Sequence, residues 1–246
     1  MTFPLEILQT IVGFLQDDQD ELARLCRVSR AFYCLAAPYL YSSPMFSTIH
    51  GFISFARHLT KDNARHVQYI ELQSANNRWK KSIGPALQRV AALHPPVEVL
   101  DLERCKFTAS DMIGVVRNLP QVRHVNMHFA YYVDDDMMRL IGQSWPNLTT
   151  LKISSTPITN DGLVALGQCK SLETLFIDRC LMINETGLLG LADKAKSLKR
   201  VVARACTDLV LQPHDEELMK KKIGLVLTDK DYAESGIDDM FDNIIL

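Results

Sequence analysis

The six cysteines are the residues best suited to metal or redox chemistry in this sequence. None of them belongs to a Cys-x-x-Cys pair, the spacing that is typical of zinc sites and redox centres. Cys105, Cys180 and Cys206 instead recur at one offset within a repeated segment, and two other copies of that segment carry Ala130 and Thr156 there. The position therefore favours small side chains, and we expect packed, reduced thiols with neither a metal nor another cofactor.

The seven histidines and a run of three aspartates are the other candidates for catalysis or ion binding. The histidines fall neither beside a nucleophile nor in a spacing such as His-Glu-x-x-His. Asp134-Asp135-Asp136 stands where a helix is expected to begin, so its charges complement the helix dipole; a cation site is the alternative. The sequence also lacks the signatures of phosphate loops, nucleophile elbows and kinases, and we expect no catalytic residues and no enzyme.

A short apolar template recurs about every 25 residues along the chain. It consists of an apolar residue, two variable ones, an apolar one, a variable one and an apolar one. The five clear copies are Val97/Leu100/Leu102, Val122/Val125/Met127, Leu148/Leu151/Ile153, Leu172/Leu175/Ile177 and Leu198/Val201/Ala203. Val67/Ile70/Leu72 is an earlier copy, which an insertion over residues 73–96 separates from the others, and Leu225 and Leu227 can supply a last one.

Each copy predicts one β-strand and one helix. The last two apolar positions alternate with variable ones, as in a strand with one buried face. A Thr, Asp or Asn then stands at a helix N-cap, between two apolar residues spaced as a hydrophobic staple. These caps are Thr108, Asp134, Thr159 and Asn184. The unit predicts an α/β solenoid, with parallel strands on its concave face and helices on its convex face.

The repeats, with their cysteine-bearing strands and the segment Ile-Thr-Asn-Asp-Gly-Leu at residues 158–163, resemble the cysteine-containing class of leucine-rich repeats. The resemblance covers about residues 65–212. We divide the chain into a helical head at 1–45, a junction at 46–64, these repeats, and a C-terminal cap with an acidic tail at 213–246. Because residues 46–64 lack a Gly- or Ser-rich composition, we expect a rigid junction.

Residues 1–45 follow a different pattern, with apolar residues at helical spacing. Phe3-Pro4-Leu5-Glu6-Ile7-Leu8 opens a first helix, an acidic turn at 17–20 ends it, and a second apolar run extends from Leu22 to Leu35. Two or three short helices form a core that is marginal alone, so a partner or the solenoid end should complete it. A helical cap that only seals the first repeat is the alternative.

This head resembles an F-box, and the whole chain resembles fungal-type F-box proteins with leucine-rich repeats. The match rests on the opening at 3–8, the apolar first helix, the acidic turn, and Val28-Ser29-Arg30 followed by aromatic residues; Phe3 replaces the usual Leu. The resemblance implies docking on the Skp adaptor of a Skp–cullin–F-box ubiquitin ligase. The implied adaptor contact comprises Pro4, Leu5, Ile7, Leu8, Ile11, Leu15, Leu22, Leu25, Val28 and Phe32.

A client protein is expected on the concave face, where the residues between the buried strand positions point outward. One predicted row across the strands is Asp101, Asn126, Lys152, Phe176 and Val202, and the next is Glu103, His128, Ser154, Asp178 and Arg204. A third row is Val99, His124, Thr150, Thr174 and Arg200.

The rows predict an exposed apolar anchor at Phe176 and Val202, beside the basic Arg200 and Arg204. The predicted client-binding residues are Asn126, Lys152, Phe176, Asp178, Arg200, Val202 and Arg204. The alternative is a solvated sheet whose Phe176 is covered by the acidic tail at 231–246.

The balance of charge argues against nucleic acid and membranes as partners. The chain has 27 basic and 29 acidic side chains, a formal net charge of −2. The sequence has no apolar stretch close to the ~20 residues that are needed to span a bilayer. We therefore expect the protein in the cytoplasm, the nucleus or both. The leading functional hypothesis is a substrate-recognition subunit of the ligase, whose partners are a Skp adaptor, a cullin through it, and an unidentified client. A repeat scaffold with no role in ubiquitin transfer is the alternative.

Overall fold

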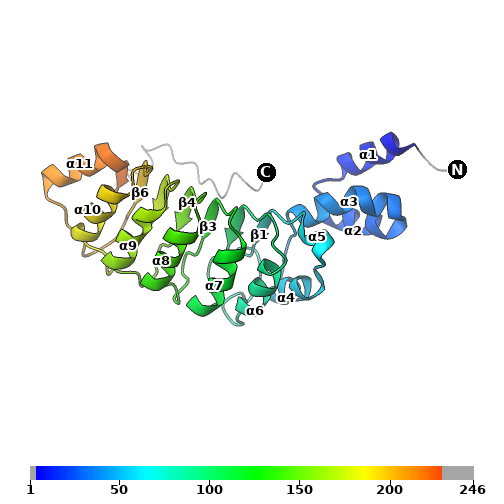
Figure 1. The fold of residues 1–246 in the computed structure, drawn as a ribbon, viewed down its shortest axis with the longest axis horizontal. Coiled ribbons are helices and arrows are strands. Elements are labelled where there is room, and N and C mark those ends of the chain that lie inside the picture. Colours follow the sequence, from blue (N-terminus) through cyan, green and yellow to red (C-terminus); the bar gives the residue numbers. More distant parts are fainter. Residues whose placement is uncertain (1–3, 229–246) are drawn as a thin grey trace.

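The computed structural model describes residues 4–228 as a helical head that projects from one end of a curved solenoid (Figure 1). The head contains α1 (Leu5–Phe14), α2 (Gln19–Val28) and α3 (Arg30–Ser42). Two further helices, α4 (Ile49–His58) and α5 (Lys61–Ala64), join it to the solenoid. Within this described range the chain therefore changes from helices alone to alternating strands and helices at residue 69.

The solenoid is one parallel sheet whose strands follow each other in sequence order. Its strands are β1 (Tyr69–Glu71), β2 (Val99–Asp101), β3 (His124–Asn126), β4 (Thr150–Lys152), β5 (Thr174–Phe176), β6 (Arg200–Val202) and β7 (Leu225–Val226). The convex layer holds α6 (Gly84–Ala91), α7 (Ala109–Asn118), α8 (Asp135–Ser144), α9 (Asn160–Ala165) with the 3₁₀ turn η1 (Leu166–Gln168), α10 (Glu185–Lys194) and α11 (Pro213–Ile223). This arrangement confirms the predicted fold class.

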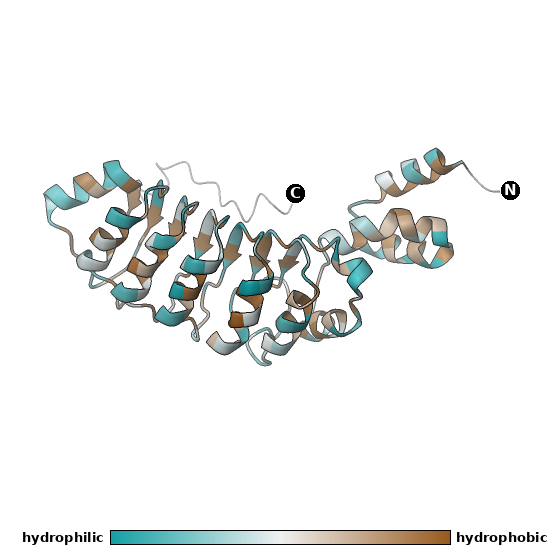
Figure 2. Cartoon of the chain, in the orientation of Figure 1, coloured by the Kyte–Doolittle hydropathy of each residue, from teal (hydrophilic) through white to brown (hydrophobic). Residues whose placement is uncertain are grey.

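The register of the sheet reproduces the predicted rows. Val99 pairs with His124, and the same row continues through Thr150 and Thr174 to Arg200. The template residues between these rows point into the core, where each central strand position is fully buried. The core contains residues of both strands and helices, and in Figure 2 the strands are coloured mainly as hydrophobic, whereas the helices mix hydrophobic and hydrophilic residues. The earlier copy at residue 67 and the degraded copy at residue 225 form β1 and β7.

The recurring cysteines are buried within this core, and two of them donate hydrogen bonds. The Cys180 thiol donates to the Ile153 carbonyl over 3.3 Å, and the Cys206 thiol donates to the Ile177 carbonyl over 3.1 Å. Thr156 occupies the same repeat position and its hydroxyl donates to the Ile153 carbonyl. Burial raises the pKa of Cys206 to about 11. These thiols are therefore protonated at neutral pH, and the position requires a small side chain, which at three of its copies donates to a strand carbonyl.

The predicted N-caps hold the starts of the convex helices. The Thr108 side chain accepts from the amide of Asp111 in a capping box, and Asp134 accepts from the amide of Met137. Thr159 and Asn184 cap α9 and α10 in the same way. These contacts satisfy amides that a helix leaves without partners in its first turn.

The three aspartates of the 134–136 run each have a protein partner. Asp134 is the cap of α8, and Asp136 pairs with Arg139. Asp135 reaches the next repeat, where its carboxylate accepts from the Thr159 amide over 2.8 Å and from the Thr159 hydroxyl over 2.6 Å. Residues 4–228 contain no group of three or more His, Cys, Asp or Glu side chains that could hold a metal ion.

The turn after each strand from β2 to β6 uses a left-handed backbone conformation. Arg104, Phe129, Ser155, Arg179 and Ala205 each lie seven residues after their repeat starts, and their φ angles range from 53° to 57°. None is a glycine, although this region disfavours side chains by roughly 1–2 kcal/mol. The turn therefore places large side chains, those of Arg104 and Phe129, at the edge of the sheet.

Hydrogen bonds connect the head to the segment that leads into the solenoid. The Tyr33 hydroxyl donates to Asn63 Oδ1 over 2.7 Å, and the Gln68 amide donates to the Ser42 carbonyl over 2.9 Å. Residues 46–64 are helical and contribute to the main core, in which Phe52 is fully buried. Residues 73–96 hold a longer loop and α6, so the predicted insertion supplies a convex helix. No helix among residues 4–228 is both long and apolar enough to cross a membrane.

Candidate protein-interaction surfaces

The first candidate surface lies on the head, where large apolar side chains face solvent. Ile7, Ile11 and Phe14 are exposed at i, i+4 and i+7 of α1 and so lie on one face of that helix, and Phe14 is 83% exposed. Val28 is exposed at the end of α2, and Leu5 is exposed at the start of α1. Because exposed apolar surface of this extent on a small domain marks an interaction site, this face of the head is a candidate surface for a partner.

The head's own core contains two of the residues predicted to contact an adaptor. Leu22 is fully buried with Val12 and Ala36, and Leu8 is buried in the same face of α1 as Val12. Their burial leaves them little surface for an adaptor, and a direct contact by them stays a prediction. Helical spacing identifies apolar positions, but it does not say which of two apolar faces the protein buries itself.

The other predicted adaptor residues divide by exposure. Pro4, Leu5, Ile7, Ile11 and Val28 are exposed, whereas Leu15, Leu25 and Phe32 are half-buried. Sequence reasoning did not assign Phe14 to this surface. Its spacing of three from Ile11 and seven from Ile7 is the signal that could have found it.

The second candidate surface is the concave face, which is less solvated than predicted at its N-terminal end. Asp101 is fully buried and accepts from Asn126 Nδ2 over 2.9 Å, and from the Glu103 amide over 3.0 Å. Asn126 in turn accepts from the His128 amide over 3.0 Å. Burial is the main cause that raises the pKa of Asp101. The expectation of an exposed Asn126 is wrong, because its amide is used to satisfy a buried carboxyl group.

The predicted apolar anchor on the concave face is also buried. Phe176 is 7% exposed and Val202 is fully buried, and with Val226 they form a small cluster across three strands. Lys152 lies over the Phe176 ring, with Nζ 5.0 Å from the ring centroid. Strands in a sheet lie ~4.8 Å apart, so side chains at equivalent positions of adjacent strands contact one another. The alternation of residues along one strand does not reveal these contacts. The acidic tail that we considered as a cover lies outside the described residues.

Opposite charges on the concave face pair within the protein. Asp178 Oδ1 accepts from the Arg204 amide over 2.7 Å and from Nε over 3.1 Å, while Arg204 Nη2 donates to Oδ2 over 2.8 Å. Arg200 is half-buried on the neighbouring row. The face thus brings Lys152, Phe176, Asp178, Val202 and Arg204 together, and client binding by them stays a prediction.

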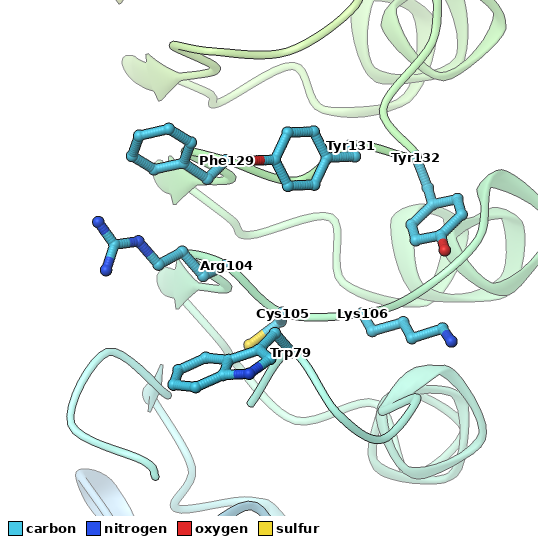
Figure 3. Close-up of a pocket in the computed structure, with 7 residues that line it drawn as sticks. All are labelled: Trp79, Arg104, Cys105, Lys106, Phe129, Tyr131 and Tyr132. Atoms are coloured by element: carbon cyan, nitrogen blue, oxygen red, sulfur yellow. The ribbon is translucent and has the colours of Figure 1, made fainter. Parts of the chain in front are cut away.

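A third surface, which sequence reasoning missed, is a pocket at the edge of the sheet (Figure 3). Its volume is about 560 Å³, and its lining comprises Trp79, Arg104, Cys105, Lys106, Phe129, Tyr131 and Tyr132. These residues come from the segments that follow β1, β2 and β3. The available signal was the pair Tyr131-Tyr132, which stands in a loop one residue longer than the loop after β2.

Comparisons with known proteins agree with this architecture. The family model of the COS11 F-box domain matches residues 1–77. Putative F-box/LRR-repeat protein 23 of Arabidopsis thaliana is 28% identical over 119 residues, which cover 46% of this chain and 26% of the relative. Antagonist of mitotic exit network protein 1 of Saccharomyces cerevisiae is 21% identical over 226 residues, which cover 80% of this chain and 41% of the relative. The chain therefore spans well under half the length of these two relatives.

Solved structures support the fold. A chain of the yeast Rad7 and Elc1 complex has a TM-score of 0.54 at 11% identity, with 94% of this chain and 66% of that chain covered. Internalin C2 from Listeria monocytogenes has a TM-score of 0.53 at 13% identity, with 86% and 92% covered. The chain carries an F-box domain at its N-terminus and continues as a leucine-rich-repeat solenoid, the arrangement of the F-box/LRR proteins to which it is similar.

Proposed function

We propose that the chain is a substrate-recognition subunit of a Skp–cullin–F-box ubiquitin ligase. In this proposal the head docks on a Skp adaptor and, through it, on a cullin, while the repeats hold a client protein. Other subunits transfer ubiquitin, so this chain takes no part in catalysis itself. Its place of action is the cytoplasm, the nucleus or both.

The observation that carries the proposal is the exposed apolar face of α1 in a segment that matches an F-box model. Ile7, Ile11 and Phe14 leave water only if a partner covers them. Burying a fully exposed side chain of this size contributes about 1.5–3 kcal/mol, so Phe14, at 83% exposed, would contribute most and the partly covered Ile7 and Ile11 less. The structural neighbour that contains Rad7 is a complex with Elc1, and this supports a protein partner here.

The mechanism of such a subunit is proximity. A client on the repeats and a ubiquitin-loaded enzyme on the cullin share one assembly, which raises their effective concentration. Such a mechanism favours a fixed geometry. The bonds from Tyr33 to Asn63 and from Gln68 to Ser42 hold the head against the solenoid and support this requirement.

Co-purification of a Skp adaptor with the full chain tests the proposal. An Ile11→Asp, Phe14→Asp double variant should lose the adaptor, because both changes place charge on the exposed face of α1 and leave the buried face intact. The matched control is Leu181→Asp, Met182→Asp, which alters two exposed apolar residues on the solenoid.

The repeat scaffold without a ligase role is the competing hypothesis. It predicts that the folded wild-type chain retains no adaptor, or that the head variant retains as much adaptor as wild type. Either result would overturn the proposed ligase role, provided circular dichroism shows equal helix content in both proteins.

A further inference from the structure

The pocket at the sheet edge exposes an unusual amount of aromatic surface for its size. Tyr131 is 71% exposed, Trp79 is 56% exposed, and Tyr132 is also exposed. In Figure 3 the Trp79 indole and the Tyr131 ring lie on opposite sides of the pocket, with the Cys105 sulfur beside the indole. Three large rings around one opening form an anchor site of the kind that dominates binding energy at protein interfaces.

The packing of the solenoid does not explain the two tyrosines. The loop after β5 has the same length as the loop after β3 and carries Leu181 and Met182 where the tyrosines stand, so the backbone does not demand aromatic rings. Val133, which follows them, supplies the buried contact of the loop. The tyrosine rings are thus available to a ligand.

The walls of the pocket are held by contacts within the protein. Arg104 and Phe129 occupy the left-handed turn position of neighbouring repeats, and the Arg104 guanidinium lies 4.9 Å from the centroid of the Phe129 ring. Phe129 also packs edge to face with His128 at 4.2 Å between centroids. A preformed wall of this kind reduces the entropy that a ligand would lose on binding.

The charge around the pocket is positive. Arg104 and Lys106 line it. Of the two acids that act on Cys105, Glu103 is shared between Arg78 at 3.4 Å and Arg104 at 3.5 Å, and Asp101 is fully buried and accepts from Asn126. Burial raises the pKa of the Cys105 thiol, so the floor is neutral. A ligand that matches this site carries acidic groups at the rim and a ring or large aliphatic group in the centre.

We propose that this pocket binds an acidic peptide segment of a partner protein. The segment inserts an aromatic or large aliphatic side chain between Trp79 and Tyr131 and places carboxylates beside Arg104 and Lys106. A volume of about 560 Å³ suits one or two side chains. A peptide fits better than single-stranded nucleic acid, because the lining offers two cations in one pocket and a strand needs a basic groove that follows its phosphates.

This inference deepens the proposed function, because it names where and by what chemistry a client would be recognised. The binding itself requires no adaptor. It can therefore be tested with the purified full chain alone.

The probe is a displayed library of random dodecapeptides selected on the full chain. Intrinsic fluorescence reports the site, because one of the two tryptophans, Trp79, is exposed at the pocket and the other, Trp145, is fully buried. Enriched peptides should combine acidic residues with an aromatic or large aliphatic one, and they should alter the Trp79 emission. Trp79→Phe removes that signal.

Two pairs of variants locate the contact. Tyr131→Ala, Tyr132→Ala should weaken the enriched peptides by about tenfold or more, whereas the matched Leu181→Ala, Met182→Ala variant should bind as wild type. Arg104→Gln should weaken binding and make it less sensitive to salt between about 50 mM and 500 mM, since a charged contact has been removed.

The proposal is overturned if the library yields no enriched peptide, if enriched peptides lack acidic residues, or if the tyrosine variant binds as tightly as its control. Tighter binding of an oligothymidylate than of any peptide would also overturn it. These results are separate from those of the adaptor experiment. Failure of the wild-type chain to retain an adaptor would refute the ligase role and leave the peptide result standing.

Discussion

Asp135 offers a stringent test of how neighbouring repeats are joined. Its carboxylate accepts two hydrogen bonds from Thr159, one from the amide and one from the hydroxyl, and both partners lie at the start of the next convex helix. Hydrogen bonds to a charged group contribute about 1.5–3 kcal/mol each, and partial exposure places these two at the lower end. We therefore expect Asp135→Ala to reduce the free energy of unfolding by about 2–3 kcal/mol.

The two neighbouring aspartates provide internal controls. Asp134 is an N-cap whose replacement by Ala should cost about 1 kcal/mol. Asp136 forms an exposed i, i+3 pair with Arg139, and Asp136→Ala should cost less than about 0.5 kcal/mol. The three substitutions should thus rank 135, 134, 136 in cost, although they remove the same chemical group from consecutive residues.

Urea denaturation followed by far-ultraviolet circular dichroism measures the three costs. The reasoning would be refuted if Asp136→Ala destabilised the protein as much as Asp135→Ala. A cation site formed by the run predicts a different result, in which all three variants are affected and added Ca²⁺ or Mg²⁺ stabilises the wild type alone.

Three further predictions concern the backbone and the pH dependence of stability. Ser155→Gly should stabilise the protein by about 1 kcal/mol relative to Ser155→Ala in urea denaturation, because the residue has a φ of 57°; equal stability of the two variants would contradict this. Gly224→Ala should lower the melting temperature, since a Cβ there would lie 2.5 Å from the Lys199 carbonyl oxygen at a φ of 51°, and an unchanged melting temperature would disprove the clash. Burial lowers the pKa of His124 and of His128 below the ordinary 6.5. As pH falls, these two histidines therefore bind protons in the unfolded chain before they do in the folded chain, and the free energy of unfolding decreases as pH falls through 6.5. The unfolding free energy should decrease from about pH 7.5 to about pH 5.5, and His128→Gln should make this decrease shallower; an equal slope in the variant would count against the assignment.

The sequence by itself determined the solenoid. Strand alternation, cap residues and small side chains after the strands recur at fixed offsets. They are local properties, and each repeat contains them in its own sequence. The predicted rows therefore match the observed register, from Val99 and His124 through to Arg200. The caps at Thr108, Asp134, Thr159 and Asn184 were equally predictable, because an N-cap depends on residues within one helical turn.

Only the tertiary structure decided which of these residues face solvent. Leu8 and Ile11 have the same hydrophobic character in one helix, yet Leu8 packs in the head and Ile11 is exposed, since the position of α3 selects the buried face. Phe176 and Val202 cluster with Val226 across adjacent strands, and Trp79 and Tyr131 line one pocket only because three loops converge at one edge of the sheet. Burial of a side chain depends on neighbours that are distant in sequence. A periodic pattern therefore identifies a helix or strand, but only tertiary packing decides which of its residues are exposed.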